Sequence, residues 1–243
     1  MFRLILLFSL LFSFSLGDDF SKSKKTLLKK VYYDHQFTFY CNNPYYIDIE
    51  DGKEVTRIHK DDSKYTPYRP LTKKKEINIR TIRVEWEHIM PAENFGRQLD
   101  CWKDGGRKNC KSDYTFNQME ADMHNLVPAI GEINGDRSNY RFNWGDPKNL
   151  KYGNCPIEID SKKVYVGQEQ KGFIARAYLY MSDKYNIKLS EGQRNLMNSW
   201  NTIFPPSDWE LIRHNRIYQL TGSYNKYIIH YKDNIKSIII PED

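Results

Sequence analysis

The segment Ile77–Ile89, INIRTIRVEWEHI, decides the fold because it has the clearest strand pattern in the chain. Side chains alternate between the two faces of a strand, so one face would carry Ile82, Val84, Trp86 and His88. Glu87 would point to the other face, and Pro91 predicts the end of the strand. The end of this strand therefore presents a carboxylate and an imidazole on opposite sides.

The adjacent pair Glu87 and His88 suits the hydrolysis of a phosphate ester. A histidine is a general base near neutral pH, and a carboxylate is a hard oxygen ligand for Mg²⁺. In-line hydrolysis needs water to attack phosphorus from one side while the leaving oxygen departs on the other. Because the two side chains face opposite sides, we expect His88 to activate the water and Glu87 to hold a metal beside the leaving oxygen.

A second segment, Met119–Tyr140, reads MEADMHNLVPAIGEINGDRSNY and is dense in ligand-type side chains. These are Glu120, Asp122, His124, Asn125, Glu132, Asn134, Asp136 and Arg137. Such a cluster indicates a functional site, although a charged helix surface with a capped start gives the same composition. A short strand is predicted at Asn125–Pro128, where His124 would be either a packed, hydrogen-bonded residue or a rival for the role of base.

The rest of the N-terminal half is predicted to form short elements. Lys22–Gln36 has the pattern of a basic helix. Strand patterns occur at Phe37–Tyr40 and Tyr45–Ile49, and Asp51-Gly52 marks a turn. Two polar or turn-rich segments are predicted to be loops: Lys60–Lys75 and Glu93–Asn117.

The C-terminal third is predicted to be helical. A helix-spaced apolar stripe consists of Phe173, Ile174, Ala177, Tyr178 and Met181. Capping boxes begin at Ser190 and Ser207, and Gly222 suits a helix C-cap. We expect the aromatic residues of these helices to lie in the core rather than to stack on bases. Strands followed by helices predict a mixed α+β fold in a single domain.

The first residues, Met1–Gly17, read MFRLILLFSLLFSFSLG and have the layout of a secretory signal peptide. One basic residue precedes an apolar run, and small residues near the end suit cleavage after Gly17. The run is too short to span a bilayer comfortably, which argues against a membrane anchor. We therefore expect one domain at residues 18–243, export to the periplasm or the medium, and no stable membrane association.

The cysteines and the net charge add two expectations. An even number of cysteines behind a signal peptide predicts disulfides, and four cysteines allow three pairings. Cys101 and Cys110 are close in sequence around a basic, glycine-containing loop, which favours that pair and leaves Cys41 with Cys155. A zinc site is the alternative, but the spacings match no common zinc pattern. The chain has 37 Lys and Arg against 31 Asp and Glu, which favours a polyanionic partner.

Two motifs resemble a known family of enzymes. EWEHIMPAENFG at Glu85–Gly96 and MEADMHNLVPAIGEINGDRSNYRF from Met119 are similar to the endonuclease I family of bacterial periplasmic and secreted nucleases. That family belongs to the His-Me finger, or ββα-metal, nucleases. The resemblance covers most of the chain, from Phe39-Tyr40-Cys41 to the region of Trp209 and Arg213. It implies a ββα-metal catalytic core followed by a helical C-terminal part.

The resemblance also implies a role for each of five residues. His88 matches the general base, and Glu87 and Asn134 match the metal ligands. Arg107 matches an arginine that contacts the scissile phosphate, and Glu120 matches an acidic residue that orients His88. The implied metal is Mg²⁺, with Mn²⁺ or Ca²⁺ as substitutes. Because the family usually has more than four cysteines, its disulfide pattern transfers only in part.

The sequence thus predicts a monomeric, metal-dependent endonuclease that hydrolyses DNA without sequence preference. RNA is an expected substrate too, because attack by external water needs no 2′-hydroxyl, and phosphate contacts carry no sequence information. One alternative is a secreted, non-catalytic nucleic-acid or polyanion binder, which leaves Glu87, His88 and Asn134 unexplained. The other is a zinc hydrolase that uses Glu87, His88, Glu120 and His124, although no HExxH spacing is present.

Overall fold

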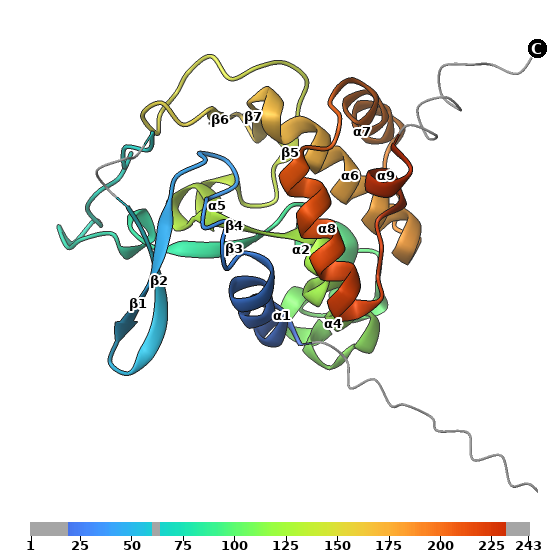
Figure 1. Ribbon diagram of the computed structural model, residues 1–243, viewed down its shortest axis with the longest axis horizontal. Coiled ribbons are helices and arrows are strands. Elements are labelled where there is room, and N and C mark those ends of the chain that lie inside the picture. Colours follow the sequence, from blue (N-terminus) through green and yellow to red (C-terminus); the bar gives the residue numbers. More distant parts are fainter. Residues whose placement is uncertain (1–18, 60–63, 232–243) are drawn as a thin grey trace, which may run out of the picture.

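The computed structural model describes residues 19–59 and 64–231, and the predicted signal peptide at residues 1–17 lies outside this range. The described chain forms one mixed α+β domain of small sheets and many helices, as predicted. Figure 1 shows the hairpin of β1 and β2 at one side of the molecule and the helices α7 and α9 at the other. No described helix is both long enough and apolar enough to cross a membrane.

The strand predicted at Ile77–Ile89 is shorter in the structure. Strand β3 spans only Val84–His88, because a 3₁₀ turn occupies Ile79–Thr81. The side chain of Asn78 starts this turn by accepting a hydrogen bond from the backbone N–H of Arg80. A local side-chain cap therefore replaces strand pairing at the start of the segment.

Strand β3 pairs antiparallel with β4 (Leu126–Ile130), and His88 lies opposite Leu126. The helix α5 (Gly131–Arg137) begins directly after β4. The strand expected at Asn125–Pro128 is thus confirmed with slightly different bounds. Asn134 lies within α5, although Asn134-Gly135 has the composition of a turn.

The N-terminal region contains a helix and a hairpin. Helix α1 (Phe20–Thr26) continues into a π-helical turn, η1 (Leu27–Val31), which confirms a helix in this region. Strands β1 (Tyr45–Glu50) and β2 (Lys53–Ile58) pair around the turn at Asp51-Gly52. The strand predicted at Phe37–Tyr40 is wrong, because this stretch forms only an isolated bridge from Phe37 to Pro44.

The loop predicted at Glu93–Asn117 is wrong in part, because it holds several short helical elements. They are α2 (Ala92–Gly96), α3 (Asp100–Lys103), η3 (Gly106–Ser112) and the start of α4 (Tyr114–Ala121). A further 3₁₀ turn, η4 (Met123–Asn125), leads into β4. Both predicted disulfides are confirmed: Cys101–Cys110 joins α3 to η3, and Cys41–Cys155 joins segments far apart in the chain.

Up to residue 231, the C-terminal part combines four helices with a small sheet. The helices are α6 (Gln168–Tyr185), α7 (Glu191–Ile203), α8 (Asp208–Thr221) and α9 (Lys226–Ile229). The sheet was not predicted; its strands are β5 (Arg141–Phe142), β6 (Ile157–Asp160) and β7 (Lys163–Val166), in the order β5-β7-β6. Tyr178, Met181 and Trp200 are buried, which confirms the prediction of core residues for α6 and α7, whereas Tyr218 of α8 is 50% exposed.

Candidate active site

The two strands and the helix β3, β4 and α5 form a compact ββα frame. Two glycines let α5 lie close to the residues before and within β3. A Cβ atom on Gly131 would lie 2.9 Å from both Arg80 O and Glu85 Oε1, and one on Gly135 would overlap the Arg80 guanidinium. The close approach of α5 therefore depends on glycine at position 131, where the contact is with a backbone atom, whereas the flexible end of Arg80 can move away from a side chain at position 135.

His88 lies on the face of β3 that α4 covers. Its Nε2 is 2.8 Å from the backbone carbonyl oxygen of Glu120. Because a carbonyl oxygen only accepts hydrogen bonds, Nε2 carries the proton, and Nδ1 keeps its lone pair. Burial lowers the pKa of His88 from 6.5 to about 4, so the ring is neutral at pH 7.

The surroundings of His88 are aromatic and cationic. The Phe20 ring of α1 lies 4.8 Å from the imidazole ring. Arg107 Nε donates to Glu120 Oε1 at 2.6 Å, and half of the Arg107 side chain stays exposed. The backbone of Glu120 thus orients His88, while its carboxylate holds Arg107. The contact with Phe20 was not predicted, since no local pattern relates the start of α1 to β3.

Glu87 lies on the opposite face of β3, as the alternation predicted. Tyr40 donates to Glu87 Oε1 at 2.9 Å, and Arg137 Nη1 lies 3.0 Å from the same oxygen. Only 3% of Glu87 is exposed, and burial raises its pKa to about 7 against the effect of these partners. Both contacts fall on Oε1, so Oε2 keeps its acceptor capacity.

Asn134 contacts a carboxylate that the sequence reading had not singled out. Its Nδ2 donates to Glu85 Oε2 at 2.9 Å. Glu85 also accepts from Arg80 at 2.6 and 3.0 Å and from Arg83 Nε at 2.8 Å. The resemblance implies that Asn134 and Glu87 bind the same metal, whereas the hydrogen bond of the Asn134 side chain goes to Glu85. The i, i+2 spacing of the two glutamates on one strand face was the signal that could have identified Glu85.

Arg137 joins α5 to the end of β3 from within the core. The side chain is fully buried, and its guanidinium donates to the carbonyl oxygens of His88 at 2.8 Å and Ile89 at 2.6 Å. Along α5, Asn134 therefore meets Glu85 while Arg137, one turn later, meets Glu87. Asn134 and Arg137 thus both face the side of β3 that carries Glu85 and Glu87.

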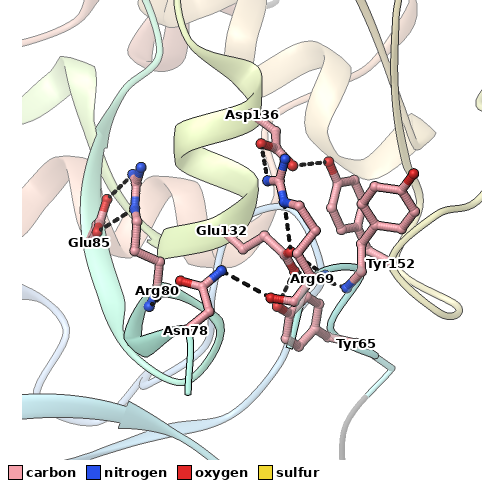
Figure 2. Close-up of polar contacts among 9 residues, drawn as sticks. Tyr65, Arg69, Asn78, Arg80, Glu85, Glu132, Asp136 and Tyr152 are labelled. Atoms are coloured by element: carbon pink, nitrogen blue, oxygen red, sulfur yellow. Dashed lines mark hydrogen bonds and ion pairs between the residues drawn. The ribbon is translucent and has the colours of Figure 1, made fainter. Parts of the chain in front are cut away.

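The acidic residues on the other side of α5 fix the helix in place (Figure 2). Glu132 accepts from Tyr65 Oη at 2.6 Å and from the backbone N–H of Arg69 at 2.7 Å. Asp136 accepts from Tyr152 Oη at 2.7 Å and from the Arg69 guanidinium. Both carboxylates are thus occupied by structural contacts, while Figure 2 shows Arg80 and Glu85 on the opposite side of the helix.

Asp122 and His124 are also part of the packing. His124 is 2% exposed, its Nε2 is 3.1 Å from Ser223 O, and burial lowers its pKa to about 3. Asp122 accepts from Tyr180 at 2.9 Å and from Lys184 at 2.7 Å. The structure therefore has His124 as the packed, hydrogen-bonded residue of the two alternatives, and Asp122 is buried beside it rather than on a charged helix surface.

The donor atoms around α5 fit a hard divalent cation. Within residues 19–59 and 64–231, no three His, Cys, Asp or Glu side chains form a group able to hold a metal, which does not favour a zinc site. Glu87 Oε2 and Asn134 Oδ1 are oxygen atoms that can bind a metal. The other polar atom of each group is already held, Glu87 Oε1 by Tyr40 and Asn134 Nδ2 by Glu85. Mg²⁺ is commonly bound by one or two protein oxygens with water and phosphate in the other positions.

Comparisons with known proteins show which proteins this chain is similar to. An extracellular deoxyribonuclease of Aeromonas hydrophila is 43% identical over 234 residues, which cover 94% of this chain and 98% of that protein. A periplasmic deoxyribonuclease of the same organism is 43% identical over 211 residues, covering 85% of this chain and 84% of its own. An endonuclease-1 of Buchnera aphidicola subsp. Baizongia pistaciae is 41% identical over 214 residues, covering 86% and 82%.

The family model for endonuclease I matches residues 19–232, a range that includes every described residue. The resemblance carried by the two sequence motifs is therefore confirmed over the full domain. The periplasmic and extracellular relatives agree with the exported location that the N-terminal segment predicts. The chain is an exported endonuclease, and it belongs to the endonuclease I family.

Proposed function

We propose that this enzyme hydrolyses phosphodiester bonds of DNA, and of RNA, with His88 as the general base. The hydrogen bond from His88 Nε2 to Glu120 O carries the proposal, because it leaves Nδ1 as the basic atom. Burial keeps the ring neutral at pH 7, so Nδ1 can accept a proton from an attacking water. The names of the deoxyribonuclease relatives support DNA as the substrate.

Arg107 would stabilise the charge that develops on the phosphate. Its side chain is half exposed beside His88, where a substrate phosphate can reach it. The guanidinium has five N–H donors, so the bond to Glu120 leaves several for a phosphate oxygen. Removing one such donor from a hydrolase typically lowers turnover by about 10²–10³.

Glu87 and Asn134 would hold a divalent cation, Mg²⁺ or in its place Mn²⁺ or Ca²⁺. When bound, the ion supplies positive charge that stabilises the leaving 3′ oxygen. Tyr40 and Arg137 hold Glu87 by one carboxylate oxygen and leave the other for the ion. Glu85 fixes the orientation of the Asn134 amide, so that the carbonyl oxygen rather than the NH₂ group serves as ligand. Glu85 is thus a positioning residue.

Cleavage without sequence preference follows from the kind of groups present. Arginine and metal contacts to phosphate read no base edges. We further propose that the enzyme acts as a monomer and that its signal peptide is removed after Gly17. Sequencing the N-terminus of the exported protein and measuring its mass in solution test these two points.

The test of the proposed function is the nicking of supercoiled plasmid by the purified enzyme. We expect nicking with Mg²⁺, none with EDTA, and recovery when excess Mg²⁺ is added back. His88→Ala is the matched control and should bind DNA without cutting it. Plasmid binding without nicking in any divalent metal would identify a non-catalytic nucleic-acid binder, and nicking in EDTA would refute the metal site.

A further inference from the structure

A hollow of about 750 Å³ lies between β5, the turn that joins β6 to β7, and the start of α7. Arg141, Trp144, Lys162, Lys163 and Gln193 are among the residues that line it. Figure 1 shows β5, β7 and α7 at the upper end of the molecule, whereas α1 and α4, which enclose His88, lie at the lower end. The hollow is therefore separate from the proposed catalytic centre.

The walls of the hollow carry positive charge without an opposing carboxylate. The lining includes three cations and no Asp or Glu. Arg141 and Lys163 are direct partners on β5 and β7, and like charges in such positions destabilise a sheet. Asp160 is the partner of Lys163 on the other side, but it is not among the residues that line the hollow. No ion pair within 4.0 Å holds any of the three cations in the described chain.

Trp144 adds an exposed aromatic ring to this charged surface. The residue is 55% exposed, although tryptophan is highly buried on average. The backbone beside it is fixed, because Asn143 N donates to Val164 O at 2.9 Å and Asn143 Nδ2 donates to Tyr165 Oη at 3.1 Å. An exposed aromatic ring on a fixed backbone, next to cations without an ion pair, is the kind of surface with which proteins bind single-stranded nucleic acid.

The start of α7 contributes a buried donor that has no partner. Gln193 is only 9% exposed, and its Nε2 is enclosed without a hydrogen bond. Ser190 caps this 13-residue helix, so the first backbone N–H groups lie at the same wall. Glu191 belongs to this turn, but it is not among the lining residues. Helix N-termini favour anions because their N–H groups and dipole carry partial positive charge.

We propose that this hollow binds a single strand of nucleic acid outside the catalytic centre. An unpaired base stacks on Trp144, and the phosphates on either side of it contact Arg141, Lys162 and Lys163. A strand fits better than a mononucleotide because three separate cations line the site and a strand offers a phosphate at each step. A duplex fits poorly because its bases are already stacked and paired. Binding here needs no cleavage, so it does not depend on the assigned catalytic residues.

The test measures the affinity of a fluorescently labelled thymidine strand of about ten nucleotides, a length within the usual site size. Fluorescence anisotropy is recorded in EDTA, which prevents cleavage through the proposed metal site. Trp144→Ala should raise the Kd at least about fivefold, the lower limit for the loss of one stacked base. Trp144→Phe should restore most of the affinity, and a duplex of equal length should be little affected by either change.

A matched pair of double variants tests the charge. Lys162→Ala with Lys163→Ala should weaken strand binding, whereas Lys73→Ala with Lys74→Ala removes two exposed lysines that do not line the hollow. Equal weakening by both pairs, or an unchanged Kd in Trp144→Ala, would overturn the proposal. Displacement of the strand by thymidine monophosphate at equal nucleotide concentration would identify a mononucleotide site instead. Plasmid nicking by all these variants should persist, which separates this test from that of the catalytic centre.

Discussion

His88 and His124 make the same hydrogen bond but lie in different surroundings. Each ring has its Nε2 near a backbone carbonyl oxygen, at 2.8 Å for His88 and 3.1 Å for His124. Burial lowers the pKa of both, to about 4 and about 3. By tautomer and charge, the two imidazoles are therefore equally suited to act as bases.

The two histidines differ in access to Nδ1. In His124 this atom is enclosed and has no hydrogen-bond partner, and the rings of Tyr180 and His214 lie 4.7 and 5.3 Å away. Nδ1 of His88 is not enclosed in this way, and the half-exposed Arg107 lies nearby. A general base needs an open path for water and substrate as well as the right protonation state. The following predictions test this comparison.

The largest expected effect is the loss of cleavage in His88→Ala. Without the proposed general base, the nicking rate should fall by about 10²–10⁴, while the affinity for DNA changes little. The measurement is the initial nicking rate of supercoiled plasmid at matched protein concentration. A rate close to that of the unmodified enzyme would remove His88 from the mechanism and reverse the comparison with His124.

The second effect concerns Glu85, which accepts a hydrogen bond from Asn134 and is proposed to orient its amide. Glu85→Ala should raise the Mg²⁺ concentration for half-maximal activity by about 10–100-fold, as expected for residues that orient metal ligands. Glu85→Gln can still accept a hydrogen bond from Asn134, so it should restore part of this loss. Calorimetric titration of Mn²⁺ into the same variants on a His88→Ala background measures binding without turnover. Unchanged Mn²⁺ affinity in Glu85→Ala would contradict the positioning role.

His124→Ala should affect stability rather than chemistry. Removing this buried ring should lower the free energy of unfolding by about 2–5 kcal/mol, the range for large-to-small changes in a core. Urea unfolding at neutral pH gives this value. The folded protein should keep its nicking rate in the absence of urea, and a rate as low as that of His88→Ala would show that His124 takes part in catalysis.

A smaller effect is the pH dependence of stability that His124 contributes. Its folded pKa of about 3 lies below the ordinary 6.5, so the unfolded chain binds the proton more tightly. The stabilisation is complete above pH 6.5 and decreases as the pH falls towards 3, by up to about 1.4 kcal/mol per pH unit. Glu87, with its pKa raised to about 7, has the opposite dependence, but it is present in both proteins compared.

Urea unfolding at several pH values between 7 and 5 measures this contribution. The difference in unfolding free energy between the unmodified protein and His124→Ala should shrink as the pH falls. A difference that stayed constant over this range would mean that His124 is protonated in the folded state. The assigned neutral tautomer would then be wrong.

The parts of the structure that could be predicted depend on local signals. The caps of α7 and α8 were predicted, and Ser190 and Ser207 accept from the backbone N–H groups of Gln193 and Glu210 as expected. The pairing of Cys101 with Cys110 also followed from nearby residues. In contrast, the Glu210 carboxylate makes a buried ion pair with Arg176 instead of completing a capping box, and only tertiary packing determines this.

The unpredicted parts of the candidate site come from contacts between distant segments. Outside this site, strand β5 has only two residues and pairs in parallel with β7, so it leaves no periodic pattern in the sequence. Phe20 reaches His88 through the packing of α1 near β3, which no spacing predicts. Asn134 was recognised as a ligand-type residue, but its contact with Glu85 depends on how α5 lies over β3. The sequence thus predicted the kinds of residues in the site better than their partners.

The Cys101–Cys110 disulfide has a consequence for the cell that makes the enzyme. Arg107 lies on the segment that this bond closes, between α3 and the end of η3. Such bonds do not persist in a reducing cytosol. We expect the reduced enzyme, and a Cys101→Ser, Cys110→Ser variant, to nick plasmid on the order of 100-fold more slowly with the fold retained by circular dichroism, because Arg107 is misplaced. Equal rates before and after reduction would contradict this. If the reduced enzyme is slow, oxidation after export activates the nuclease. The producer's own chromosome is then protected until the nuclease has left the cytosol.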